Sequence, residues 1–212
     1  MKVDRESLIL YAITDRTWLN GKALKDEVKA AIEGGATMIQ LREKNLSYEE
    51  FFEEAYEING VCREYKVPLI INDNPVIATK VGAAGVHIGQ DDGNIRLIRK
   101  TAGESMIIGA TAHNVEEAVK AYEAGADYLG SGAVFGSTTK KDAVPMTKET
   151  LRAITSAVPI PVVAIGGITY ENMGELENTG IAGMALVSAV FAEKDITGAC
   201  MRLKERIIET IG

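Results

Sequence analysis

Residues 114–130 read NVEEAVKAYEAGADYLG, and this stretch contains one complete helix-to-strand unit. Asn114, with Glu117 three residues later, forms an approximate capping box, so we expect a helix over Val115–Ala124 that the following glycine ends. A tight turn then leads into the apolar run Tyr128–Gly130, which is typical of a buried strand. The unit is a helix, a glycine turn and a strand.

The same glycine turn recurs elsewhere in the chain. It is present as Gly34-Gly35-Ala36, Gly82-Ala83-Ala84-Gly85 and Gly180-Ile181-Ala182-Gly183. Eight apolar runs have the length of buried strands: Leu8–Ile13, Met38–Leu41, Leu69–Ile71, Gly85–Ile88, Met106–Gly109, Tyr128–Gly130, Val162–Ile165 and Met184–Val187. Between the runs, apolar residues recur at helical spacing, for example over 24–32 and 196–207. The chain therefore alternates strand and helix throughout.

Eight parallel strands with helical crossovers form either a closed (β/α)₈ barrel or a doubly wound open sheet. A dinucleotide-binding open sheet carries GxGxxG after its first strand, whereas here the first run continues into Thr14-Asp15-Arg16. Gly130-Ser131-Gly132 with Gly136 has the wrong spacing and follows the sixth run. We therefore predict an α/β fold, with residues 1–212 forming a single TIM-barrel domain.

The composition excludes several classes of protein. A net charge of −7 argues against nucleic-acid binding through a basic surface. Cys62 and Cys200 are far apart in the sequence, so we expect neither a disulfide framework nor a zinc site. The N-terminus has no secretory pattern, and the apolar stretch Gly183–Ala192 is too short to span a membrane. We expect a cytoplasmic protein that does not bind membranes.

The motifs of hydrolases and zinc enzymes are also missing. Neither GxxxxGK[ST] nor GxSxG occurs, and His87 and His113 have no HExxH context and no nearby cysteine. Neither histidine is therefore assigned as a catalytic acid or base.

Polar residues follow the second predicted strand as Gln40-Leu41-Arg42-Glu43-Lys44. In a barrel enzyme the active site lies on the loops that follow the strands. Strand alternation places Gln40, Arg42 and Lys44 on one face, and Leu41 and Glu43 on the other. The alternative is a solvated strand end with an arbitrary charge pattern, so the interpretation depends on the neighbouring strands.

Carboxylates follow the next two predicted strands. Asn72-Asp73-Asn74 comes after the third, and the run His87–Asp92 comes after the fourth. Because neighbouring strands lie ~5 Å apart, Asp73 and one of Asp91 or Asp92 are placed to share a Mg²⁺ ion. The competing interpretation of Asp91-Asp92-Gly93 is a helix N-cap or a turn, and both roles can coexist.

Loops suited to phosphate follow the last three predicted strands. The run Gly132–Asp142 contains several hydroxyls and ends in two lysines. Gly166-Gly167-Ile168-Thr169 and Ser188-Ala189 offer the bare backbone N–H groups that barrels use to bind phosphate. An ordinary polar loop is the alternative for the first of these runs.

With these motifs in order along essentially its whole length, the chain resembles the thiamine phosphate synthase family. The family motifs QLREK, ND, HxGQxD, GxSxH and TxTK are matched by Gln40–Lys44, Asn72-Asp73, His87–Asp92, Gly109–His113 and Ser137–Lys140. Thr111 and Ser137 depart from the family residues but keep a hydroxyl. Gly136 and Thr138 stand where the family often has proline.

The resemblance implies which residues hold the ligands. The pyrimidine diphosphate would be held by Gln40, Leu41, Arg42, Glu43, Lys44, Asn72, Thr111 and Lys140, of which Arg42, Lys44 and Lys140 are the catalytic cations. The thiazole phosphate would be held by Ser137, Thr138, Thr139, Gly167, Val187 and Ser188. One Mg²⁺ ion per subunit would be bound by Asp73 and Asp92, which resolves the choice between Asp91 and Asp92.

The implied activity is a transferase of thiamine biosynthesis. It joins 4-amino-2-methyl-5-hydroxymethylpyrimidine diphosphate to thiazole phosphate and releases thiamine phosphate and diphosphate. A thiazole tautomerase-like isomerase and a non-catalytic thiazole-phosphate binder of the same fold are the alternatives. Neither of these needs Asp73, Asp92, Arg42 and Lys44 together, so the joint presence of the four favours the transferase. The sequence leaves the oligomeric state open.

Overall fold

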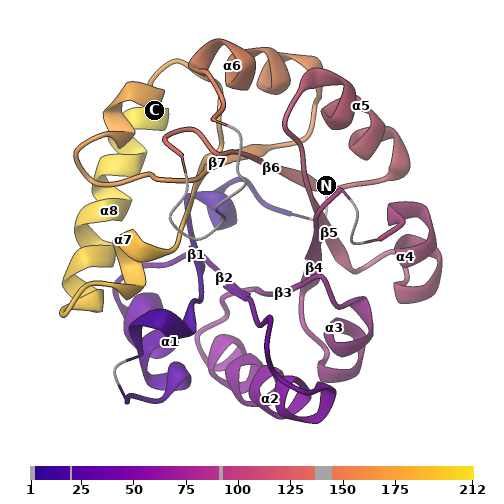
Figure 1. Ribbon diagram of the computed structural model, residues 1–212, viewed down its shortest axis with the longest axis vertical. Helices are drawn as coiled ribbons and strands as arrows, with labels where there is room; N and C mark the ends of the chain where they lie inside the picture. Colours follow the sequence, from indigo (N-terminus) through magenta and orange to yellow (C-terminus); the bar gives the residue numbers. More distant parts are fainter. Residues whose placement is uncertain (1–2, 20, 91–92, 137–144) are drawn as a thin grey trace.

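The computed structural model of this protein describes residues 3–19, 21–90, 93–136 and 145–212. Eight parallel strands close into a barrel in the order β1 to β8, and the helices surround it (Figure 1). The strands are β1 Leu10–Ile13, β2 Met38–Leu41, β3 Leu69–Asn72, β4 Gly85–Ile88, β5 Ile107–Thr111, β6 Tyr128–Gly132, β7 Val162–Ile165 and β8 Gly183–Leu186. The prediction of a (β/α)₈ barrel is confirmed, and the open sheet is excluded.

Helices fill the crossovers between consecutive strands. The α-helices are α1 Leu24–Glu33, α2 Tyr48–Glu64, α3 Pro75–Val81, α4 Ile95–Ala102, α5 Val115–Ala124, α6 Lys148–Ala157, α7 Ser188–Phe191 and α8 Ile196–Ile211. Three short 3₁₀ helices are η1 Glu6–Leu8, η2 Arg16–Trp18 and η3 Met173–Leu176. None of the helices in the described ranges is both long and apolar enough to cross a membrane.

The turn signals in the sequence have the predicted roles. Asn114 caps α5 by accepting a hydrogen bond from the Glu117 backbone N–H at 2.9 Å. Gly125 ends the helix in the left-handed conformation, with φ at 103°, which a residue with a Cβ adopts only with strain. A complete reciprocal capping box is found at Ser47 and Glu50, where α2 begins.

Several element boundaries differ from the prediction. β1 begins at Leu10 because the preceding residues form the 3₁₀ helix η1. Strands β3, β5 and β6 continue past the predicted apolar runs to Asn72, Thr111 and Gly132, because polar side chains are accommodated at the barrel mouth. The crossover between β7 and β8 contains η3 in place of the expected α-helix.

Side chains of each strand alternate between two separate apolar layers. In β1, Tyr11 and Ile13 belong to a buried cluster inside the barrel. Leu10 and Ala12 belong to the larger cluster between the strands and the surrounding helices. This alternation decides which residues of each strand face the barrel interior and which face the helices.

The N-terminal segment closes the barrel at the end opposite the mouth. Val3 and Leu8 are 1% and 0% exposed and share the interior cluster. The backbone of Leu8 approaches β8 so closely that a Cβ at Gly183 would lie 1.9 Å from the Leu8 carbonyl oxygen. A residue larger than glycine therefore does not fit at position 183.

We expect Gly183→Ala to destabilise the protein by roughly 1–3 kcal/mol, because backbone rather than a movable side chain occupies the space needed by the methyl group. Gly60→Ala is the matched control. Gly60 lies in α2 with no atom within 4 Å of its Cβ position, so the control should gain roughly 0.5–1 kcal/mol. Chemical denaturation measures both free energies of unfolding, and equal effects would contradict the proposed clash.

Candidate active site

The end of β2 meets the end of β3 at the barrel mouth. The Lys44 Nζ lies 2.5 Å from the Asp73 Oδ2, and the Asn72 amide donates to the same oxygen at 2.5 Å. The side chains of Lys44 and Asp73 are 47% and 21% exposed, so both are accessible from solvent. Two of the predicted catalytic and metal-binding groups are therefore in direct contact.

The backbone holds Asp73 in an unusual conformation. Its φ is 59°, in the left-handed region, where aspartate and asparagine are tolerated better than most residues. The Asp73 backbone N–H donates to the His87 carbonyl at 2.8 Å. This bond ties the end of β3 to β4, so the position of the carboxylate is fixed by two strands.

Leu41 and Glu43 point away from the barrel interior, as the alternation predicts. Leu41 packs in the outer apolar layer. Glu43 is 4% exposed and accepts a hydrogen bond from Arg16 Nε at 2.9 Å, and the same guanidinium also pairs with Glu54 of α2. This cluster joins the loop after β1 to the segment that carries Arg42 and Lys44.

The surroundings of Glu43 change its protonation. The Glu43 Oε1 and the Glu54 Oε2 are buried and have no hydrogen-bond partner. Burial raises the pKa of Glu43 from 4.5 to about 7, and the neighbouring Glu54 adds to this effect, while Arg16 opposes it. When Glu43 is protonated, its carboxyl O–H can donate a hydrogen bond to the Glu54 carboxylate. This bond gives a partner to a buried carboxyl oxygen that otherwise has none.

Two other predicted pyrimidine residues lie on the inner side of the barrel. Gln40 is 3% exposed and its amide donates to the Tyr11 hydroxyl at 2.6 Å. The Thr111 hydroxyl lies 3.1 Å from the His87 Nε2. Arg42 comes directly after the end of β2, and its backbone N–H donates to the Thr14 hydroxyl at 3.0 Å.

The opposite side of the mouth is formed by the loops after β7 and β8. Gly167 has φ at 64°, and a Cβ there would lie 2.4 Å from the Phe135 carbonyl oxygen. Val187 and Ser188 follow β8 directly, at the start of α7. Since β7 and β8 are neighbours, these residues lie at the same part of the rim.

Five predicted site residues lie outside the described residues: Asp92, Ser137, Thr138, Thr139 and Lys140. Among the described residues, no group of three or more His, Cys, Asp or Glu side chains is arranged to hold a metal. Of the two predicted metal ligands, Asp73 lies within the described residues.

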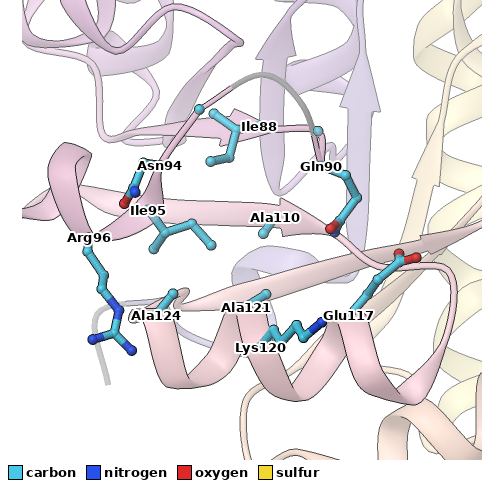
Figure 2. A pocket seen from close by; sticks show the side chains of 12 residues that line it. Ile88, Gln90, Asn94, Ile95, Arg96, Ala110, Glu117, Lys120, Ala121 and Ala124 are labelled. Atoms are coloured by element: carbon cyan, nitrogen blue, oxygen red, sulfur yellow. The ribbon is translucent and has the colours of Figure 1, made fainter.

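A groove of about 240 Å³ lies on the outer side of β4 and β5, against α4 and α5. Figure 2 shows Gln90 and Glu117 at one end and Arg96 at the other, with Ile88 and Ala110 coming from the strands. None of the predicted substrate residues in the described ranges lines it. Gln90 and Gly93 of its lining flank Asp92 in the sequence, and Asp92 lies outside the described residues.

Known proteins are similar to this chain in both sequence and fold. The thiamine monophosphate synthase family matches residues 10–190. The chain belongs to this family. Thiamine-phosphate synthase of Clostridium tetani is 47% identical over 194 residues, covering 92% of this chain and 93% of the relative. That of Clostridium novyi is 48% identical over 195 residues, covering 92% and 96%.

A solved structure agrees with these relatives. Thiamine phosphate pyrophosphorylase from Pyrococcus furiosus has a TM-score of 0.90 and 40% identity, covering 98% of this chain and 99% of that chain. The expected membership of the thiamine phosphate synthase family is thus confirmed, and the protein is a transferase of thiamine biosynthesis.

Sequence reasoning missed several residues that shape the synthase site. Tyr11 and Tyr128 lie in strands that were interpreted as purely apolar, yet both hydroxyls are hydrogen-bonded inside the barrel. Arg16 and Glu54 hold Glu43 from distant parts of the sequence. The inward register of the two tyrosines was readable from strand alternation, whereas the Glu43 cluster had no local signal.

The raised pKa of Glu43 makes stability depend on pH. Between pH 4.5 and about 7 the folded synthase retains a proton on Glu43 that the unfolded chain has released. The contribution of this group to stability is therefore largest at the acid end and decreases as pH rises through the window. We expect Glu43→Gln, which keeps a hydrogen-bond donor without the titration, to remove this decrease.

Denaturant unfolding of the wild type and the variant across the window tests this expectation. Glu53→Gln, an exposed position in α2, is the matched control and should follow the wild type. Parallel pH profiles for the wild type and Glu43→Gln would contradict the assignment.

Proposed function

We propose that this thiamine phosphate synthase joins the pyrimidine diphosphate to thiazole phosphate with one Mg²⁺ ion per subunit, using the residues at the barrel mouth. The observation that carries the proposal is the contact of Lys44 with Asp73, next to Asn72. A cation for diphosphate and a carboxylate for metal meet where β2 and β3 end. An isomerase or a simple thiazole-phosphate binder has no need of this pair.

The donor chemistry of Asp73 fits Mg²⁺. Its carboxylate offers hard oxygens and is partly exposed at the mouth, and Mg²⁺ is commonly bound through one or two carboxylates together with substrate phosphates. Asp73 and Asp92 would hold the ion, with Asp92 outside the described residues. When bound, the ion would neutralise negative charge on the diphosphate.

The cations of the chain would stabilise the diphosphate as it leaves. Arg42 and Lys44 follow the end of β2, and Lys140 would approach from the loop after β6. Negative charge increases on the leaving group as its bond to the pyrimidine CH₂ breaks, so cations held in advance lower the barrier. The thiazole nitrogen attacks with its own lone pair, so no general base is needed.

An electron-rich aminopyrimidine can delocalise positive charge at the CH₂ carbon. We therefore propose a dissociative path, in which cleavage of the bond to diphosphate runs ahead of attack by the thiazole nitrogen. The synthase would hold the thiazole in line through its phosphate.

The other side of the mouth would bind the thiazole phosphate. Support comes from Gly167, which leaves its backbone exposed, and from Val187 and Ser188 at the start of α7. Backbone N–H groups at such positions suit phosphate oxygens. Ser137, Thr138 and Thr139 would complete this pocket, so the two substrates would approach each other across the mouth.

We also propose that the synthase acts in the cytoplasm on small molecules. Cys62 and Cys200 are free and buried, and burial raises the pKa of each thiol to about 12. Such thiols are unreactive and agree with a reducing compartment.

The direct test supplies purified protein with both substrates and Mg²⁺, and measures diphosphate release together with thiamine phosphate formation. We expect both products in equal amounts and no turnover after chelation of the metal. Binding of both substrates without product would overturn the assigned reaction for this chain.

Asp73→Asn should lower turnover by at least the roughly 10–100-fold that accompanies loss of a group supporting a metal site. Its affinity for thiazole phosphate, measured by calorimetry, should stay close to that of the wild type because Gly167 and Ser188 lie across the mouth. Asp26→Asn, an exposed position in α1, is the control for the substitution itself. Equal losses of turnover and thiazole phosphate affinity would mean that Asp73 has a purely structural role.

A further inference from the structure

A chain of hydrogen bonds crosses the interior of the barrel beneath the mouth. The Gln40 Nε2 donates to the Tyr11 hydroxyl at 2.6 Å, and the Tyr11 and Tyr128 hydroxyl oxygens are 2.8 Å apart. The Tyr128 hydroxyl lies 3.0 Å from the His87 Nδ1. The His87 Nε2 lies 3.1 Å from the Thr111 hydroxyl. Five strands, β1, β2, β4, β5 and β6, therefore contribute to one polar network.

The barrel is shaped to hold this network. Tyr11 and Tyr128 are 1% and 0% exposed. A Cβ at Gly109 would lie 2.1 Å from the Tyr128 Cζ, and a Cβ at Gly130 would lie 3.1 Å from the His87 Cε1. Glycines on β5 and β6 thus leave room for the two rings. Buried hydroxyls without partners would be costly, so each bond of the network stabilises the fold.

Either hydroxyl of the Tyr11–Tyr128 pair could donate, and the roles of the His87 nitrogens depend on the tautomer. With Gln40 donating to Tyr11, the arrangement in which every group of the network donates one bond directs the Tyr11 proton to the Tyr128 oxygen. The Tyr128 proton is then directed to the His87 Nδ1. A neutral imidazole that accepts at Nδ1 carries its proton on Nε2, and it donates that proton to the Thr111 oxygen. The Thr111 proton is left for a group at the mouth.

Burial keeps both phenols protonated, as this direction requires. It raises the pKa of Tyr11 and of Tyr128 well above the ordinary value of 10.0. At neutral pH the two hydroxyls therefore each remain a donor of one hydrogen bond.

We propose that Tyr11, Tyr128 and His87 are positioning residues, which hold Gln40 and Thr111 in one fixed arrangement of donors and acceptors toward the pyrimidine substrate. Gln40 then presents its carbonyl oxygen as an acceptor, and Thr111 presents its O–H as a donor. An aminopyrimidine carries the complementary pair, an amino N–H and a ring nitrogen. This inference rests on the proposed assignment of Gln40 and Thr111 to the pyrimidine diphosphate.

The protonated nitrogen of His87 is the direct readout of the network. The chain has two histidines, so nitrogen NMR of ¹⁵N-histidine protein, with a His113→Gln variant for assignment, resolves His87 without any ligand. We expect neutral His87 with its proton on Nε2 in the wild type. Tyr128→Phe removes the donor to Nδ1, so it should produce a mixture of the two tautomers.

Steady-state kinetics supply the second readout. Tyr128→Phe and Tyr11→Phe should raise the KM for the pyrimidine diphosphate roughly tenfold, as loss of one well-placed hydrogen bond does. The KM for thiazole phosphate should not change. Tyr122→Phe, at a 42% exposed tyrosine of α5, is the matched control and should leave all values unchanged.

His87→Gln retains an N–H donor in place of Nε2, so it should preserve the pyrimidine KM better than His87→Leu. Thermal unfolding identifies any variant that fails to fold. If Tyr128→Phe fails to fold, Tyr11→Phe takes its place in both measurements.

The inference would be overturned if His87 of the wild type carried its proton on Nδ1. It would also be overturned if neither tyrosine variant changed the tautomer of His87. Equal rises in the two KM values would do the same. A wild type that forms no thiamine phosphate would instead refute the proposed function, while the NMR result would still report on the network.

Discussion

The structure depends on the two-residue alternation of side chains along parallel strands that are closed into a ring. Closure makes one face of every strand an interior face, so each strand contributes residues to two environments that do not mix. At the end of β2 this separates Gln40, which bonds to Tyr11 inside the barrel, from Leu41, which packs against the helices. Glu43, two residues after Leu41, is anchored by Arg16 on the outer side, so the motif places the residues proposed to bind the pyrimidine next to structural anchors.

The anchors matter for the proposed mechanism, in which the cations at the mouth are held in place before substrate binds. Glu43 fixes the backbone between Arg42 and Lys44 through Arg16 and Glu54. Asp73 is fixed by its backbone bond to His87. Polar groups that are already in position before the reaction need little reorganisation while it proceeds. This preorganisation is the main source of electrostatic catalysis. The interior network applies the same principle to neutral donors and acceptors.

Much of the fold was predictable from sequence because its signals are local. Glycine turns such as that at Gly125, and the order of polar residues after each apolar run, identified the barrel and placed Asp73 and Lys44 at one rim. The roles of Tyr11 and Tyr128 were not predicted. A tyrosine within an apolar run gives the same sequence pattern whether or not its hydroxyl forms a hydrogen bond inside the barrel. The 3₁₀ helix η3 was missed because the glycine turn at Gly180 indicates where the crossover ends and does not distinguish an α-helix from a 3₁₀ helix.

The close approach of Tyr128 to Gly109 has a consequence for how such sequences diverge. The ring occupies the space that any side chain at position 109 would need. Two positions 19 residues apart on adjacent strands are therefore constrained as a pair, and a larger residue at one is tolerated only with a smaller residue at the other. Loss of the tyrosine would also remove a hydroxyl from the network. Neutral drift at this point of the barrel is thus restricted to paired, compensatory substitutions.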